Sequence, residues 1–125
     1  MAYRPVPIGS HEQYELFRIE GAPDALLLSH KDGQVYQDDW NILLRIMAEH
    51  PGCCRFILEL GSRSYLSLMV LRSLAGTPEE RPPVAVLTGS RHLEETIDQI
   101  NNVPELGNIP VFYNLENAVD QYRPQ

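Results

Sequence analysis

Residues 82–122 read PPVAVLTGSRHLEETIDQINNVPELGNIPVFYNLENAVDQY and contain one pattern twice, a short hydrophobic run followed by an amphipathic one. The runs 84–87 and 109–113 predict buried strands, because short apolar segments bounded by turn residues are typical of strands. Each is followed by a residue suited to cap a helix, Ser90 in the first case and Asn114 in the second. The inward faces of the two predicted helices carry Leu93, Ile97 and Ile100, and Leu115, Ala118, Val119 and Tyr122. Strands that alternate with helices in this way indicate an α/β fold with a parallel sheet.

The preceding part of the chain extends this alternation toward the N-terminus. The segments 14–20 and 25–30 are predicted to pair as a hairpin, since turn residues separate two apolar runs. One helix is predicted over 38–49 and another over 66–75, each with one apolar face. The strand between them, 53–60, has apolar side chains on both faces, as interior strands do. The expected order is β-β-α-β-α-β-α-β-α, with a mixed, mostly parallel sheet of about five strands and about four helices.

Length and composition are those of a small globular protein. The 125 residues suit one domain, expected over residues 13–123 after a loose N-terminal leader, residues 1–12, which has no hydrophobic period. The formal net charge of −7 argues against nucleic-acid binding and against docking on anionic membranes. No stretch approaches the roughly 20 apolar residues that span a bilayer, and no signal peptide is evident. A cytoplasmic location is therefore expected.

In its order of elements, and above all in its C-terminal third, the sequence resembles the STAS domains of anti-sigma-factor antagonists and sulfate transporters. The resemblance runs from about Tyr14 to Tyr122 and rests on pattern and spacing. Its ending, with IPVF at 109–112 and LENAV at 115–119, looks like the last strand and closing helix of that family. Glu59, which ends a hydrophobic strand, also fits the order of that family.

The resemblance carries expectations about function. It implies a STAS-like single domain that acts as a regulatory protein–protein interaction module in a bacterium, without enzymatic activity and without a cofactor. The partner that it implies is an anti-sigma factor or a kinase-like regulator. A homodimer is compatible with this role. Binding to nucleic acid and insertion into a membrane are not expected.

The chain departs from the family at the switch loop. Members that are switched by phosphorylation carry Asp-Ser-Ser-Gly before the second helix, and their kinase partner phosphorylates a serine there. The corresponding residues here are Ser62, Arg63, Ser64 and Tyr65. Because the strict motif is missing, two readings stay open: either the chain has no phospho-switch, or Ser62 or Ser64 is the residue that is phosphorylated.

Two loops that join a strand to a helix are candidate binding surfaces on the residues alone. Residues 61–64 and 88–91 each combine glycine, serine and arginine, and such loops can hold an anion with backbone N–H groups, hydroxyls and a guanidinium. Adjacent parallel strands would bring them side by side at the carboxyl edge, where α/β sheets bind ligands. In the simpler alternative, Ser64 and Ser90 only cap helices and the arginines are solvated. The predicted partner- or anion-binding residues are Ser62, Arg63, Ser64, Tyr65, Ser90 and Arg91.

Catalytic and metal chemistry find little support in the sequence. Cys53 and Cys54 fall in a predicted buried strand, where thiols are usually inert, and the spacing of Cys and His fits no metal site. His92 lies near Ser90, but no residue is placed to orient it. A phospho-receiver is rejected because Lys31 is the only lysine and precedes the late strands. No catalytic residue, metal or cofactor is predicted, and the alternative function is a carrier or sensor for a nucleotide, an anion or a lipid.

Overall fold

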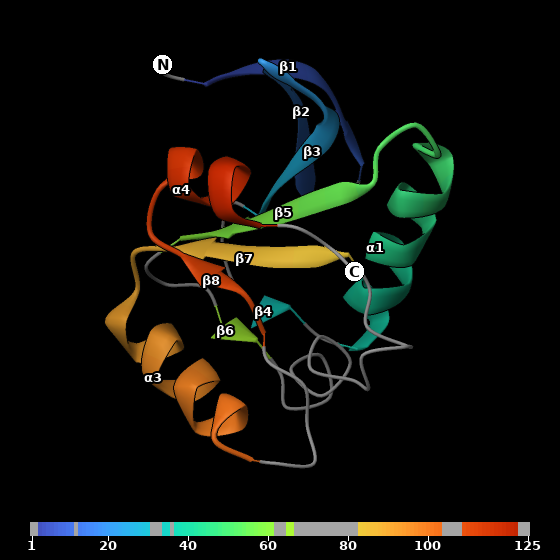
Figure 1. The fold of residues 1–125 in the computed structure, drawn as a ribbon. Helices are drawn as coiled ribbons and strands as arrows, with labels where there is room; N and C mark the ends of the chain where they lie inside the picture. The colour runs from blue at the N-terminus through green and yellow to red at the C-terminus, as the bar shows by residue number, and fades with distance from the viewer. Residues whose placement is uncertain are drawn as a thin grey trace.

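The computed structural model describes residues 3–11, 13–30, 34–35, 37–61, 65–66, 83–103 and 109–122. Its centre is a six-stranded sheet in the order β1-β2-β3-β5-β7-β8 (Figure 1). The strands are β1 (Arg4–His11), β2 (Tyr14–Glu20), β3 (Ala22–His30), β5 (Arg55–Leu60), β7 (Val84–Thr88) and β8 (Val111–Phe112). The pairs β1–β2 and β2–β3 are antiparallel, whereas β3–β5, β5–β7 and β7–β8 are parallel. The predicted α/β class is confirmed, with six strands in the sheet in place of about five.

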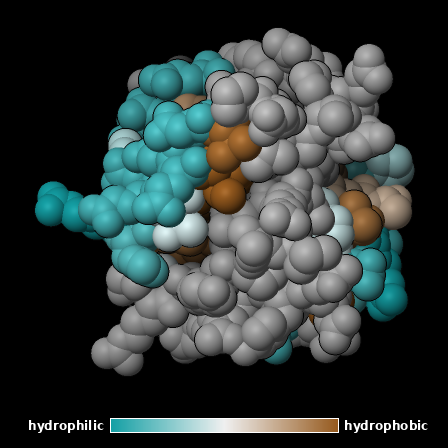
Figure 2. Space-filling model, turned by 90° about the horizontal axis from the view of Figure 1, so that it is seen from below, coloured by the Kyte–Doolittle hydropathy of each residue, from teal (hydrophilic) through white to brown (hydrophobic). Residues whose placement is uncertain are grey.

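The described helices cover both faces of this sheet. They are α1 (Gln37–Glu49), α3 (Arg91–Asn101) and α4 (Leu115–Gln121). α1 and α3 pack on one face and α4 packs on the other (Figure 1). Where Figure 2 colours the surface on the side of α3, it is largely hydrophilic. The buried residues of this helix are Leu93 and Ile97. Within the described residues, no helix has the length and hydropathy needed to cross a membrane.

Each face of the sheet has its own hydrophobic core, because successive side chains of a strand point to opposite faces. On β5, Phe56 and Leu58 face α1 and α3, while Ile57 faces α4. The larger core adds Leu43, Ile46, Leu93 and Ile97 from the two helices, and the smaller core adds Ala118 and Val119 from α4. Burial on both faces explains the continuous apolar run of this strand, so the prediction of an interior strand is confirmed for residues 55–60. Its predicted start is wrong, because Cys53 and Cys54 precede the strand and Cys54 is exposed.

The expectation of a loose leader is wrong over residues 4–11, which form β1 at the edge of the sheet. The strand is mostly exposed, so its sequence shows no alternation of apolar and polar residues. Pro5 and Pro7 are compatible with a strand here, because an edge strand needs backbone donors on one side only. The pairing shifts register between Pro7 and Gly9, and Gly9 has a φ of +152°, which favours glycine.

A second, two-stranded sheet pairs β4 (Gln34–Val35) with β6 (Tyr65–Leu66) in parallel. The predicted start of a helix at Leu66 is therefore wrong, and the rest of that helix, residues 67–75, lies outside the described residues. The spacing of apolar residues gives no information about the pairing of Leu66 with Val35, because Val35 lies far away in the sequence. Tyrosine beside leucine also suits a short strand.

Candidate functional site

A hollow of about 450 Å³ lies at the carboxyl edge of the parallel strands. The described residues that line it come from the ends of β3, β5 and β7 and from the segment that leads into α4. They are Ser29, His30, Glu59, Leu60, Gly61, Leu87, Thr88, Gly89, Tyr113, Asn114 and Leu115. α/β sheets bind their ligands at this edge, because the loops that follow the strands diverge there. We call this space the carboxyl-edge hollow.

The floor of the hollow follows from strand register. Ser29 on β3 pairs with Glu59 on β5, which pairs with Leu87 on β7, so the three residues form one row across the sheet. The residues two positions earlier, Leu27 and Ile57, belong to the core under α4, and alternation puts the row on that same face. The hydroxyl of Ser29 donates to Glu59 Oε1 at 3.0 Å. A half-buried carboxylate therefore lies at the bottom of the hollow with one oxygen held in place.

The two loops singled out in the sequence meet at this edge. Leu60 pairs with Thr88, and the next residues in the chain, Gly61 and Gly89, both line the hollow. The expectation that the strand ends would bring the loops side by side is confirmed for these two glycines. Ser62, Arg63 and Ser64 lie outside the described residues, and the backbone of Tyr65 belongs to β6.

Ser90 caps helix α3, as the simpler of the two predictions for this residue expects. Its Oγ accepts the N–H of Leu93 at 3.3 Å, and its own N–H donates to Thr88 Oγ1 at 3.0 Å. Both side chains are buried, so these bonds fix the turn from β7 into α3. Arg91 is exposed and is not among the described residues that line the hollow. Since those residues include Glu59 and neither arginine nor lysine, the described part of the hollow does not suit an anion.

Tyr113 and Asn114 form the wall on the side of α4. Asn114 caps that helix, because its Oδ1 accepts the N–H of Asn117 at 2.8 Å. The Tyr113 side chain is 60% exposed, and its hydroxyl donates a short hydrogen bond to Glu94 Oε1 on α3. This bond to a carboxylate raises the pKa of the Tyr113 phenol above its ordinary value. An aromatic ring is thus held at the mouth of the hollow.

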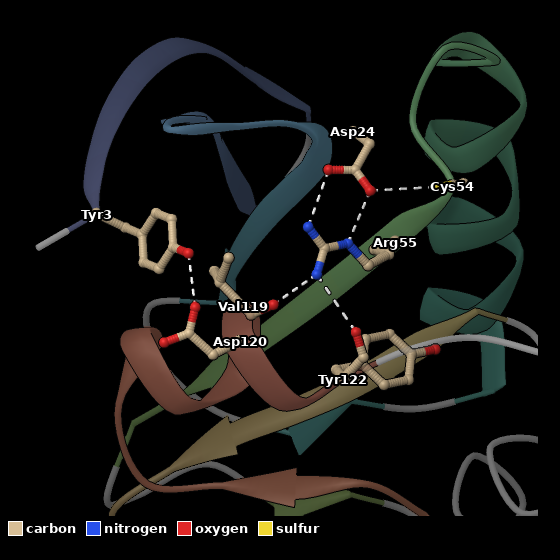
Figure 3. A network of polar contacts seen from close by, with 7 residues as sticks. All are labelled: Tyr3, Asp24, Cys54, Arg55, Val119, Asp120 and Tyr122. Carbon is tan, nitrogen blue, oxygen red and sulfur yellow. Dashed lines mark hydrogen bonds and ion pairs between the residues drawn. The ribbon is translucent and has the colours of Figure 1, made fainter. Parts of the chain in front are cut away.

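The opposite end of α4 is held at the amino edge of the sheet (Figure 3). Arg55, at the start of β5, donates to both carboxylate oxygens of Asp24 at 2.9 Å. The same guanidinium donates to the carbonyl oxygens of Val119 at 2.6 Å and Tyr122 at 3.3 Å. The Cys54 thiol donates to Asp24 Oδ2 at 3.4 Å. We call the cluster of Arg55 with its acceptors Asp24, Val119 and Tyr122 the Arg55 latch.

Charge stabilises the Arg55 latch. The hydrogen bond from Arg55 holds the pKa of the Asp24 carboxyl below its usual value, and the same bond raises the pKa of Arg55. Arg55 is buried, whereas the Asp24 side chain is 43% exposed. Because α4 begins beside the hollow and ends at this latch, the latch helps to set the position of one wall of the hollow.

Sequence reasoning did not single out Ser29, Tyr113 or Asn114 as site residues. What they share is a position at or just after the end of a strand of the sheet. This position could identify them as site residues only if the strand register were known. Among the described residues, no group of three or more His, Cys, Asp or Glu side chains is arranged to hold a metal. Both cysteines are free, and burial raises the pKa of the Cys53 thiol.

Comparisons with known proteins return no match: no protein-family model, no curated protein and no solved structure is similar to this chain.

Proposed function

We propose that this chain is a regulatory protein-binding module that receives its partner at the carboxyl-edge hollow. The observation that carries the proposal is the hollow itself, which lies where the strands end and has the exposed Tyr113 ring at its mouth. Tyrosine is enriched in protein interfaces, because its ring buries a large area while its hydroxyl keeps a polar partner. The resemblance to anti-sigma-factor antagonists supports the same surface. The partner expected from it is an anti-sigma factor or a kinase-like regulator in the cytoplasm, and no catalytic step is needed.

Phosphorylation of Ser62 or Ser64 is the proposed control of this binding. Ser62 follows Gly61 directly in the chain, and Gly61 lines the hollow together with Glu59. A phosphate adds about −1.5 to −2 charges at neutral pH, and next to a carboxylate this charge is repulsive. Repulsion from Glu59 would displace the segment that follows Gly61 and so alter the surface that the partner contacts.

Affinity capture tests this function. Immobilised wild-type protein, a Tyr113→Ala variant and a Glu49→Gln variant are exposed to lysate of the source organism, and retained proteins are identified by mass spectrometry. Glu49 lies at the far end of α1, so its variant serves as the control. We expect one regulator to be retained by the wild type and by Glu49→Gln and to be lost with Tyr113→Ala. Equal retention by Tyr113→Ala would rule out docking at the hollow.

The phosphorylation step has its own comparison in the same assay. Ser64→Asp places a negative charge in the candidate switch loop, and Ser10→Asp places one on exposed strand β1. We expect Ser64→Asp alone to release the partner. If Ser64→Asp and Ser62→Asp both retain the partner as the control does, negative charge in the loop does not regulate binding.

A second candidate function is favoured by the size of the hollow. Its volume of about 450 Å³ falls in the range of small-molecule pockets, so a carrier or sensor is the alternative. A thermal-shift screen with nucleotides, phospholipid head groups and neutral metabolites tests it. A ligand that raises the melting temperature of the wild type but not of Tyr113→Ala would favour this function. The absence of a shift with every compound would count against it.

A further inference from the structure

We propose that the carboxyl-edge hollow recognises the guanidinium group of an arginine side chain that projects from the protein partner, with Glu59 as its ion-pairing residue. The inference rests on the proposed function and deepens it, because it names the chemistry of the partner at this site. Four features of the hollow lead to it: the Glu59 carboxylate, the absence of a compensating cation among its described residues, the charge around it, and the Tyr113 ring.

Glu59 is prepared for a charged partner. Its Oε1 accepts the hydroxyl of Ser29 at 3.0 Å, and its Oε2 has no donor among the described residues. A cation that pairs with such a carboxylate in good geometry can offset the hydration that the two groups lose on binding. A planar guanidinium can donate two parallel N–H groups to a carboxylate, which is the strongest arrangement for such a pair.

The charges around the hollow select against anions. The described residues that line it include no lysine and no arginine, and the Tyr113 hydroxyl is hydrogen-bonded to the carboxylate of Glu94. The Glu59 carboxylate attracts a cation that enters the hollow and repels an anion. The formal net charge of −7 also draws cationic surfaces toward the protein.

Tyr113 adds a second element of recognition. Its ring is exposed, and its hydroxyl is tied to Glu94, which restricts how the ring can rotate. Guanidinium groups stack on the faces of aromatic rings, and this cation–π contact strengthens when the pair leaves water. An arginine that reaches Glu59 would pass Tyr113, so its side chain would contact the ring.

The source of the guanidinium follows from the openness of the site. The hollow lies at a loop edge of the sheet, and its lining combines polar residues with the apolar side chains of Leu87 and Leu115. A side chain of three methylene groups and a charged head matches such a lining, since arginine packs its stem on apolar groups while its head stays polar. Its main chain can remain outside, as a protein partner requires.

The experiment measures binding of an acetylated and amidated peptide Gly-Arg-Ser-Gly by calorimetry, next to the same peptide with citrulline in place of arginine. Citrulline keeps the shape and removes the charge. The proteins are the wild type, Glu59→Gln and the control Glu49→Gln, whose carboxylate lies at the opposite edge. About 150 mM salt screens unspecific attraction between exposed charges. We expect the wild type and Glu49→Gln to bind the arginine peptide about tenfold more tightly than the citrulline peptide, and Glu59→Gln to lose this preference.

Each outcome decides between explanations. Equal binding of both peptides to the wild type, or an unchanged preference in Glu59→Gln, would overturn the inference. Free arginine or agmatine that binds more tightly than the peptide would show a small-molecule site and would also overturn it. Matching circular dichroism spectra of the three proteins show that Glu59→Gln is folded. If the peptide preference is found but the capture experiment retains no partner, the proposed function fails and the chemistry of the site stands.

Discussion

Arg55 is buried at the start of β5, where its guanidinium donates four hydrogen bonds. Two of them go to the carbonyl oxygens of Val119 and Tyr122 at the end of α4, where the last carbonyl groups of a helix commonly bond outside it. At the scale of the residue, this arrangement could not be predicted, because Asp24 and Val119 lie 31 and 64 positions away in the sequence. The alternation of apolar residues placed Arg55 in a strand but gave no information about its partners.

Removing the Arg55 side chain should cost much more stability than removing an exposed arginine. Arg55→Ala removes the ion pair of Asp24 and two hydrogen bonds to carbonyl groups at the end of α4, so we expect a loss of about 2–3 kcal/mol in the free energy of unfolding. Arg4→Ala is the control, because Arg4 and Glu20 form an exposed pair at 3.9 Å, and it should cost less than about 0.5 kcal/mol. Urea unfolding measures both values, and equal losses would contradict the role of the Arg55 latch.

The Arg55 latch should also give stability a dependence on acid. The pKa of Asp24 is lower in the folded protein than its ordinary value of 3.8, so its contribution is present above that value and is lost as the pH falls through the folded pKa. Urea unfolding of the wild type and of Asp24→Asn between about pH 6 and about pH 2 tests this. The difference in stability between the two proteins should shrink toward the acid end. A difference that stays constant would show that Asp24 is not the group responsible.

At the scale of the element, the sequence located the strongly patterned segments and missed the exposed ones. The predicted helix 38–49 and strand 84–87 agree with α1 and β7 to within one residue. α1 buries one face and β7 buries both, and this burial produces the apolar pattern in their sequences. β1 buries little, and β6 has two residues, so neither produces a readable pattern. Capping of α3 was predictable because it depends on adjacent residues only.

Ser90 provides a test of that cap. Ser90→Ala removes the oxygen that accepts the Leu93 N–H, and loss of an N-cap costs about 1 kcal/mol. Ser10→Ala changes an exposed serine on β1 and should change stability by less than about 0.5 kcal/mol. Thermal or urea unfolding of the two variants gives the comparison. An equally small effect of Ser90→Ala would mean that the cap contributes nothing to the start of α3.

At the scale of the whole molecule, the hollow arises from the meeting of segments that are far apart in the sequence. Parallel pairing brings the ends of β3, β5 and β7 to one edge, and α4 crosses the other face from that edge to the Arg55 latch (Figure 1). The sequence indicated the edge, because parallel strands were expected, and it indicated that Gly61 and Gly89 would meet. It could not show that Ser29 and Glu59 share a row, since strand register depends on the packed sheet.

The proposed binding surface is the carboxyl-edge hollow. The most direct test is a map of backbone amide shifts in the ¹⁵N–¹H spectrum of the wild type as the arginine peptide is added. We predict that the largest changes fall on Glu59, Gly61, Gly89 and Tyr113, with little change at Arg55 on the opposite edge. Changes that centre on the exposed outer face of α3, or that spread evenly over the acidic surface, would contradict the account.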